Sequence, residues 1–177
     1  MKLGFLASHG GSNMQAILDR CRDGSISATP ALLICNNPNA QAVERAQLAG
    51  IPTRILNGKS HPDPDALDNA ILNTLRNARV DLIVLAGFMK KIGPRTMAAF
   101  RNRIVNIHPS LLPKYGGKGM YGLRVHEAAL DSGETETGAT VHLIGSAYDE
   151  GPILQQASVP ILPNDTPETL QLRVLAQ

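Results

Sequence analysis

Short apolar runs alternate with longer segments of helical period along the first part of the chain. The runs have the length of buried strands, and the predicted strands are Leu3–Ala7, Ala31–Cys35, Thr53–Leu56, Val80–Ala86 and Arg103–Ile107. The intervening segments repeat apolar residues with the helical period, which predicts helices over Met14–Arg22, Ala40–Ala49 and Ala66–Asn77. Strands that alternate with helices form right-handed βαβ units, so we expect an α/β protein with a mainly parallel, twisted sheet and helices on both faces.

The pattern changes after Ile107. A stretch rich in Pro and Gly, Pro109–Gly122, comes before the remaining predicted elements, which are a helix near Val125–Ser132, strands near Ala139–Ile144 and Ile153–Pro160, and a helix over Thr166–Gln177. A second half of this kind often carries antiparallel strands at one edge of the sheet. The sequence contains neither an internal repeat nor a long linker, and we expect one domain over residues 1–177.

Composition and charge argue against a nucleic acid or a membrane as the partner of this protein. The 177 residues carry 17 Lys and Arg against 15 Asp and Glu, a formal net charge of +2, which leaves no basic field of the kind that binds DNA. Only 3% of the residues are aromatic, so stacking faces for single strands are scarce, and we expect no nucleic-acid partner. Apolar runs stay short of the roughly 18 residues of a membrane span and the start lacks a signal-peptide pattern, so we expect a cytoplasmic protein without a membrane partner.

The cysteines and histidines do not form a metal-binding pattern. Cys21 and Cys35 fall in or beside apolar segments, which favours reduced thiols in the core. The histidines show neither zinc-finger nor HExxH spacing; they are His9, His61, His108, His126 and His142. We therefore expect no metal.

A Gly-rich loop, Ser8–Asn13, lies between the first predicted strand and the first predicted helix. Backbone N–H groups in such a turn, together with the positive end of the helix dipole, can bind a phosphate. Ser12 or Asn13 can serve as the N-cap of the helix or donate to phosphate oxygens. The residues leave two interpretations open, a phosphate-binding loop or a plain tight turn followed by a capped helix.

Asn106 and His108 mark the end of the fifth predicted strand. Alternation along a strand puts the two side chains on one side, and in open α/β sheets ligands bind beyond the carboxyl ends of the strands. An amide beside an imidazole suits the stabilisation of a developing oxyanion, and the imidazole can transfer a proton near neutral pH. The alternative is a capping Asn and a surface His without a chemical role.

Four motifs occur in order along the chain, and they carry a resemblance that runs from Met1 to Gln177 at near-constant spacing. They are Ser8–Asn13, Leu85–Met89, Asn106–Tyr115 and Asp149–Leu154. Together they closely resemble the folate-dependent phosphoribosylglycinamide formyltransferases of purine biosynthesis. The resemblance implies a Rossmann-like formyltransferase fold, in which the amine of glycinamide ribonucleotide attacks the formyl carbon of 10-formyltetrahydrofolate, a co-substrate. These small molecules are the expected partners, and we expect a monomer or a homodimer.

The resemblance implies roles for three side chains. His108 resembles the catalytic histidine, which in its protonated form stabilises the tetrahedral intermediate and donates a proton. Asn106 resembles the amide that helps to hold the oxyanion, and Asp149 resembles the carboxylate that favours the imidazolium and helps to move the proton through water. An imidazolium is indeed a stronger oxyanion partner than a neutral ring. Without the resemblance, Asp149 is interpreted as part of a simple turn.

The resemblance also implies two ligand-binding segments. The residues expected to bind the ribose phosphate are Gly11, Ser12 and Asn13. The residues expected to line the folate pocket are Met89, Lys90, Lys91, Ile92 and Asn106, together with the loop Ile144–Asp149. Either lysine can also approach the anionic glutamate tail of the folate; the alternative treats both as solvated charges.

Several positions depart from the family pattern. His9 stands where many members carry Gly, and Pro64 stands where some place an arginine near the folate. The loop Gly116–Gly122 is longer than in compact relatives, which suggests either a flap from which Lys118 reaches an anion or a tolerated surface insertion. Family members usually continue for another helix and strand, and we expect this chain to lack that C-terminal segment.

Two other interpretations of the function stay open. One is another formyltetrahydrofolate-using transferase or hydrolase of the same fold, such as a methionyl-tRNA formyltransferase or a formyltetrahydrofolate hydrolase. The other is a non-catalytic module that binds a phosphate or a nucleotide with the Ser8–Asn13 loop alone.

Overall fold

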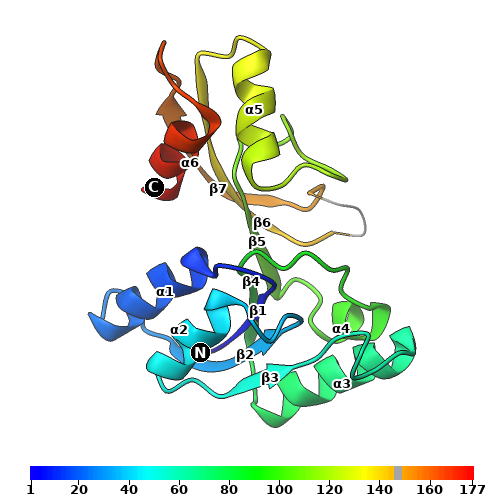
Figure 1. Ribbon diagram of the computed structural model, residues 1–177. Coiled ribbons are helices and arrows are strands. Elements are labelled where there is room, and N and C mark those ends of the chain that lie inside the picture. The colour runs from blue at the N-terminus through cyan, green and yellow to red at the C-terminus, as the bar shows by residue number, and fades with distance from the viewer. Residues whose placement is uncertain (146–148) are drawn as a thin grey trace. The chain divides into compact units, whose positions relative to one another are not determined.

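The computed structural model describes residues 1–145 and 149–177, and the chain divides into two compact units. The first unit is Met1–Val105 and the second is Asn106–Gln177. Figure 1 labels the helices and strands of both. The expectation of one domain over residues 1–177 stays a prediction.

The first unit alternates strands and helices, as predicted. Its strands are β1 (Lys2–Ala7), β2 (Thr29–Cys35), β3 (Thr53–Ile55) and β4 (Leu82–Leu85). Its helices are α1 (Ser12–Arg22), α2 (Gln41–Leu48), α3 (Pro64–Asn77) and α4 (Pro94–Ala99). β1 pairs in parallel with β2 and with β4, and β2 pairs in parallel with β3.

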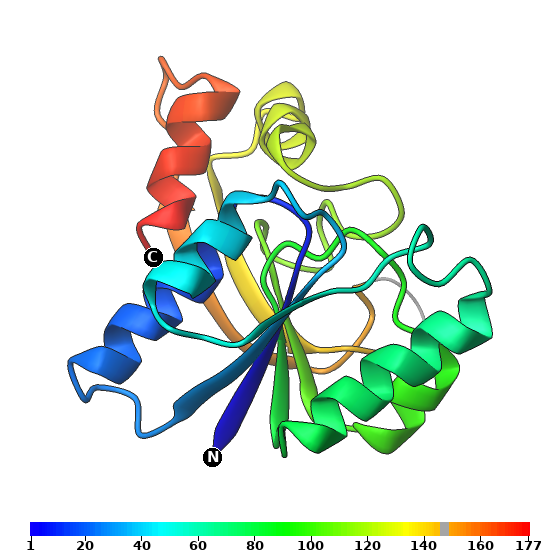
Figure 2. The same ribbon diagram turned by 60° about the horizontal axis from the view of Figure 1, so that its bottom comes forward.

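Helices cover both faces of this parallel sheet because the strand order reverses at β1. α1 and α2 connect strands that step from β1 toward β3, whereas α3 leads from β3 to β4 on the other side of β1. Right-handed crossovers then place α1 and α2 on one face and α3 on the other, as Figure 2 shows. In open α/β sheets, ligands bind at such a reversal point, beyond the carboxyl ends of the strands.

The strands of the first unit are largely apolar because both faces of the sheet are covered. Phe5 of β1 and Leu33 of β2 are fully buried, and Met14 and Leu18 of α1 belong to the same core cluster. Burying one such side chain contributes about 1.5–3 kcal/mol to folding. This core positions the ends of β1 and β4, and therefore the loops that follow them.

The second unit contains the end of β5 and an antiparallel strand pair. Its elements are β5 (Ile104–His108, which begins in the first unit), α5 (Leu123–Asp131), β6 (Glu136–Leu143), β7 (Ile153–Pro160) and α6 (Pro167–Leu175). β6 and β7 are antiparallel, and hydrogen bonds link the strands in the order β3-β2-β1-β4-β5-β6-β7. The predicted α/β class, with a mainly parallel sheet and an antiparallel edge, is confirmed.

Apart from shifts of one or two residues at the ends of elements, three details differ from the sequence prediction. The pattern does not predict α4, whose six residues are too few to show a helical period. β6 begins at Glu136 rather than near Ala139, because Thr137 and Gly138 are buried and already pair with residues of β7. The N-cap of α1 is Gly11, so the prediction that Ser12 or Asn13 caps this helix is wrong.

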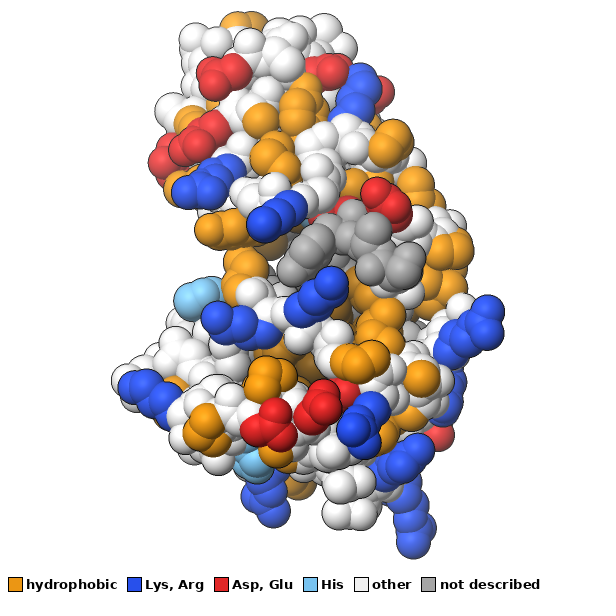
Figure 3. Space-filling model, turned by 90° about the vertical axis from the view of Figure 1, so that its right-hand side faces the viewer, with side chains coloured by type: hydrophobic (Ala, Val, Ile, Leu, Met, Phe, Trp, Pro, Cys, Tyr) orange, Lys and Arg blue, Asp and Glu red, His pale blue; other side chains and the backbone are white. Residues whose placement is uncertain are grey.

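On the face shown in Figure 3, Lys and Arg side chains lie scattered among acidic, apolar and neutral ones. Within residues 1–145 and 149–177, no helix is long and apolar enough to cross a membrane. Cys35 is buried, Cys21 is half-buried, and both are free.

Candidate active site

The loop between β1 and α1 turns sharply and leaves the first amides of the helix without a side-chain cap. Gly11, the N-cap residue, has a φ of 67°, in the left-handed region that favours glycine. A Cβ added at Gly11 would lie 2.8 Å from the Cβ of Ala42, so a side chain does not fit there. Ser12 is exposed and Asn13 is half-buried. Backbone N–H groups at the start of α1 are thus placed to bind an anion, which the helix dipole also favours.

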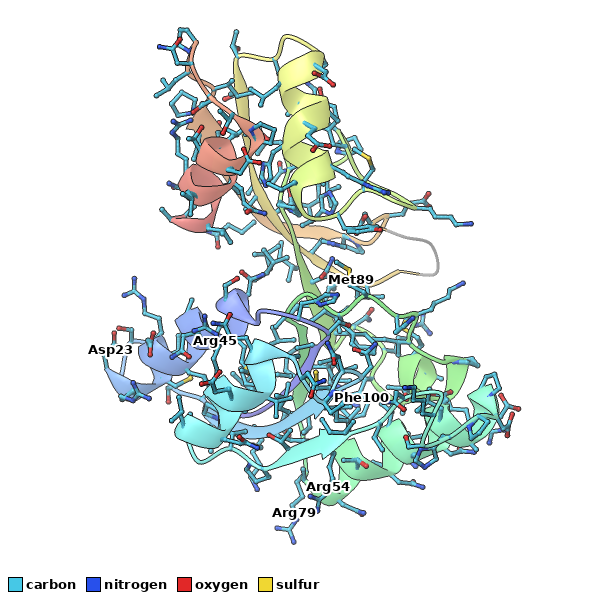
Figure 4. All side chains as sticks on the ribbon, in the orientation of Figure 1. Asp23, Arg45, Arg54, Arg79, Met89 and Phe100 are labelled. Atoms are coloured by element: carbon cyan, nitrogen blue, oxygen red, sulfur yellow. The ribbon has the colours of Figure 1, made fainter. Side chains whose placement is uncertain are left out.

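The next helix, α2, braces this loop. Nε of Arg45 donates to the carbonyl of Gly10 at 3.0 Å, and Nη1 of Arg45 donates to Oε1 of Gln15 at 3.4 Å. Figure 4 labels Arg45, which extends from α2 beside α1. The N–H of Ala42 donates to the carbonyl of His9 at 3.0 Å. The departure at His9 therefore preserves a backbone contact of the loop, while its side chain is exposed.

Ser8 joins this loop to the segment that follows β4. Its N–H donates to the carbonyl of Gly87 at 3.1 Å, and its Oγ accepts the N–H of Met89 at 2.8 Å. Ser8 is only 2% exposed, so water competes little for these bonds. The side chains of Met89, labelled in Figure 4, and of Lys90 and Lys91 are exposed. The structure thus brings the predicted phosphate loop beside the start of the predicted folate segment.

Asp68 holds the far end of the same segment. This buried carboxylate of α3 accepts the N–H of Arg95 at 2.8 Å, and the N–H and Oγ1 of Thr96 at 3.2 and 2.6 Å. It caps α4 from another helix, because Gly93, the N-cap residue, has no side chain of its own. A Cβ added at Gly93 would lie 2.1 Å from Cγ of Asp68. The half-buried Ile92 therefore precedes a fixed helix start.

The departure at Pro64 has a structural explanation. Pro64 is the first residue of α3, where its fixed φ is favourable and its missing N–H costs nothing. The side chain of Asp63 caps the helix by accepting the N–H groups of Asp65 and Ala66 at 3.3 and 3.1 Å. Pro64 starts a helix here and offers no charge to a ligand.

In the second unit, His108 lies at the end of β5 and is 4% exposed. Its Nε2 donates to the carbonyl of Tyr115 at 2.7 Å, and its Nδ1 lies 3.5 Å from Oδ2 of Asp149. The structure therefore brings Asp149 beside His108, as the resemblance implies. Sequence spacing alone contains no sign of this contact.

His142 of β6 connects Asn106 to Asp149, a role that its place in the sequence does not predict. Its Nδ1–H donates to the carbonyl of Leu143 at 3.0 Å, so its Nε2 accepts from Nδ2 of Asn106 at 3.1 Å. The same Nε2 lies 3.6 Å from Oδ1 of Asp149. Burial lowers the pKa of His142, against a smaller opposing effect of Asp149, and this favours the neutral ring that the hydrogen bonds require.

This cluster can stabilise a negative oxygen. Nδ2 of Asn106 carries two hydrogens, of which His142 accepts one, and the second can point at an oxyanion. His142 thereby orients the amide. In the sequence, His142 is an isolated histidine that alternates along β6 with the buried Gly138 and Thr140. This pattern is typical of a core position and does not by itself predict a functional role.

The segment after His108 is tied to the antiparallel strands. Oγ1 of Thr140 accepts the N–H of Leu112 at 3.0 Å and donates to the carbonyl of Ser110 at 2.6 Å. Nε2 of Gln156, on β7, donates to the carbonyl of Leu112 at 3.0 Å. The Leu112–Pro113 peptide bond is cis. These bonds fix the path of the chain away from His108.

The predicted flap, Gly116–Gly122, is attached to the same cluster. The N–H of Gly117 donates to Oδ2 of Asp149 at 2.9 Å. Gly117, Gly119 and Gly122 have positive φ values, with open space at each Cβ position, and Lys118 is exposed. The reach of Lys118 to an anion stays a prediction. The predicted folate loop, Ile144–Asp149, includes residues 146–148, which lie outside the described residues.

The fold and the cluster agree with a comparison to known proteins. A family model described as "Formyl transferase" matches residues 1–177 of the chain. The chain belongs to the formyl transferase family.

The relatives and solved structures within this family are similar over nearly the whole chain. A phosphoribosylglycinamide formyltransferase of the chloroplast from Arabidopsis thaliana is 42% identical over 98% of this chain, which spans 60% of that relative's length. The phosphoribosylglycinamide formyltransferase of Haemophilus influenzae is 40% identical, over 99% of this chain and 81% of the relative. The structure of glycinamide ribonucleotide transformylase 1 from Symbiobacterium toebii matches with a TM-score of 0.92 and 41% identity, over 99% of this chain and 81% of that one.

Proposed function

We propose that this formyl transferase moves the formyl group of 10-formyltetrahydrofolate to the amine of N1-(5-phosphoribosyl)glycinamide, a step of purine (IMP) synthesis. The observation that carries the proposal is the buried His108 at the end of β5, in contact with Asp149, with Asn106 on the same strand. The names of the relatives and of the solved structure support the same reaction. Small molecules are then the partners, and we propose a cytoplasmic location for this metabolic step.

The first unit supplies the binding segments. The N–H groups of Gly11, Ser12 and Asn13 bind the phosphate of the ribonucleotide, where the helix dipole of α1 favours an anion. The segment Met89–Ile92 contacts the folate, and the bond from Met89 to Ser8 fixes its start. Exposed Lys90 and Lys91 lie on that segment and suit the anionic tail of the folate.

The second unit supplies the chemistry. The amine nitrogen attacks the formyl carbon, and the electron pair of the C=O bond moves onto oxygen. The amide of Asn106 and the imidazolium of His108 stabilise that oxyanion. The intermediate then collapses: the carbon–N10 bond breaks, N10 takes the proton of His108, and the attacking amine loses its own proton through Asp149 and water. Atoms and charge balance without a metal.

A comparison of acceptors tests the proposal. Purified protein is mixed with 10-formyltetrahydrofolate and glycinamide ribonucleotide, methionyl-tRNA or water alone, and loss of the formyl group is followed by absorbance. We expect release of tetrahydrofolate that depends on glycinamide ribonucleotide, and its absence in the His108→Asn protein. Release in water alone would make the protein a hydrolase, and binding without release would make it a non-catalytic module.

A further inference from the structure

Tyr115 combines an unusual backbone conformation with a position beside His108. Its φ is 55°, in the left-handed region that non-glycine residues rarely adopt. Within residues 1–145 and 149–177, the other non-glycine residues of positive φ are Arg79, Asn102 and Asp149. Two of these four, Tyr115 and Asp149, contact His108 directly. Strained conformations persist where the surroundings hold them, and they cluster at functional sites.

The side chain of Tyr115 is held by the turn after α5. Its hydroxyl forms a hydrogen bond with Oγ of Ser132 and lies 3.4 Å from Oε1 of Glu134. Oγ of Ser132 donates to the carbonyl of Ala129 at 3.0 Å, at the end of α5. Nζ of Lys114 contacts both carboxylate oxygens of Glu134, at 2.9 and 3.0 Å. The residue that points its carbonyl at His108 is therefore fixed from its far end.

The contacts of His108 distinguish its two ring nitrogens. The distance from Nε2 to the Tyr115 carbonyl is 2.7 Å, a close hydrogen bond, and a carbonyl can only accept. The distance from Nδ1 to Oδ2 of Asp149 is 3.5 Å, which is an ion-pair distance and leaves Nδ1 room for another partner. Nε2 therefore has a fixed proton, and Nδ1 is the nitrogen that can gain or lose one.

The same loop holds the carboxylate. Two residues beyond Tyr115, the N–H of Gly117 donates to Oδ2 of Asp149 at 2.9 Å, which is the oxygen nearest to Nδ1. A Cβ added at Gly116, between them, would lie 2.6 Å from Cδ2 of Leu112 and 3.4 Å from Cβ of Asp149. The backbone of residues 115–117 thus supplies the carbonyl that accepts from His108 and the N–H that donates to Asp149.

We propose that Tyr115 is a positioning residue that selects Nδ1 of His108 as the nitrogen that exchanges the proton. The Tyr115 carbonyl keeps Nε2 protonated in both charge states of the ring, and the hydroxyl anchor keeps that carbonyl in place. The inference deepens the proposed function and rests on it for one point only: the Nδ1–H bond breaks as the N–H bond forms on the departing folate nitrogen, and water beside Asp149 returns the proton.

The tautomer of His108 is the direct test, and it needs no substrate. The protein is labelled with 15N at histidine, the neutral ring is observed by two-bond 15N–1H correlation, and the His108→Asn spectrum assigns the signals. We expect the Nε2–H tautomer in the wild type. The Nδ1–H tautomer would overturn the proposal.

Removing the hydroxyl anchor tests Tyr115 itself. In Tyr115→Phe we expect a mixture of tautomers and a kcat lower by about five- to tenfold, the equivalent of one hydrogen bond, with KM within about twofold. Ser27→Ala removes a hydroxyl from an exposed serine of the first unit, and it should match the wild type. Ser132→Ala tests the anchor from its other side and should act like Tyr115→Phe, which covers the case of a poorly folded Tyr115→Phe protein.

The outcomes separate this inference from the proposed function. A wild-type tautomer and a wild-type kcat in both anchor variants would leave Tyr115 with a structural role only and would overturn the proposal. Failure of the wild type to formylate glycinamide ribonucleotide would instead refute the proposed function, while the tautomer result would still decide the role of Tyr115.

Discussion

The candidate functional residues of the two units present different chemical groups. In the first unit the important contacts are backbone groups placed by glycines and loops, such as Gly11 before α1 and the Met89 N–H on Ser8. In the second unit they are polar side chains that contact one another, such as Asn106 with His142 and His108 with Asp149. The buried polar side chains in the described parts of the first unit are Ser8, Asp68 and Thr96, and those of the second are His108, Ser110, His126, Thr137, Thr140 and His142.

This difference separates recognition from chemistry. A phosphate is bound well by fixed N–H groups, which any parallel-sheet loop of the right shape can provide. Proton transfer requires a titratable side chain, and its properties depend on burial and on neighbouring charges. Substitutions in the first unit should therefore alter binding, and those in the second should alter turnover or the pH dependence of the protein.

Asp149→Asn should show the largest effect on turnover. It removes the charge that faces Nδ1 of His108 while keeping the size of the side chain. We expect formyl transfer to fall by about 10²–10⁴-fold, the range of general acid–base contributions, with binding of both ligands retained. Steady-state rates with saturating ligands measure this loss. A rate near that of the wild type would remove Asp149 from the proton path.

Gly138→Ala should destabilise the second unit more than Gly4→Ala destabilises the first. A Cβ at Gly138 would lie 1.9 Å from the carbonyl oxygen of Ala157, a backbone atom of the paired strand. A Cβ at Gly4 would lie 2.9 Å from methyl groups of Val80, which can move. We expect losses of about 3 and 1 kcal/mol in the free energy of unfolding, measured with urea. Equal losses would contradict the assigned backbone contact.

Asp68→Ala should cost more than Asp63→Ala, because the two carboxylates cap helices in different surroundings. Asp68 is buried and holds two N–H groups and one hydroxyl of the α4 start, whereas Asp63 is exposed. We expect losses of about 2 and 1 kcal/mol in the free energy of unfolding. Urea midpoints measure both. The reverse order would show that α4 does not depend on its remote cap.

Ser8→Ala should weaken folate binding by about fivefold, or about 1 kcal/mol, because the N–H of Met89 loses its acceptor. The turnover number at saturation should stay within about twofold, since the chemistry is assigned to the other unit. Calorimetry with a non-reactive folate measures the affinity, and Ser27→Ala, at an exposed serine, is the matched control. A reduced kcat with unchanged affinity would contradict the division between the units.

A pH series should show the smallest effect, confined to the second unit. Burial lowers the pKa of both His126 and His142, and the charge of His108 lowers that of His126 further. A lowered histidine pKa means that the unfolded chain binds protons first, so stability is retained above the ordinary value of 6.5 and is lost as the pH falls below it. The urea concentration at the midpoint of unfolding should decrease as the pH is lowered from 7.5 to 5.5. His126→Gln should make this decrease smaller. A midpoint independent of pH in this range would contradict the neutral buried rings.

Most of the first unit could be predicted from the sequence because strand and helix periods are local. Leu3–Ala7 and Ala66–Asn77 repeat their apolar residues at the spacing of a strand and of a helix, and both elements lie there. α4 could not be predicted because its six residues are too few to show a helical period. Its cap also could not be predicted, because it comes from Asp68, 27 positions before Arg95.

The site of the second unit was less predictable because its contacts join distant positions. Alternation placed Asn106 and His108 together on one strand, but the pairing with Asp149 came from the resemblance and not from spacing. His142 and Tyr115 were missed for different reasons. His142 has the sequence context of a core strand residue. Tyr115 contributes its backbone carbonyl, from a residue in the left-handed conformation, and the residue type alone predicts neither feature.

The most direct test of the account is single-turnover formyl transfer by His108→Asn, with the dissociation constants of both ligands measured on the same protein. We expect transfer slower by about 10²–10⁴-fold and affinities within about twofold of the wild type, because binding is assigned to the first unit and the proton to His108. Transfer within about tenfold of the wild-type rate, or loss of both affinities, would contradict it.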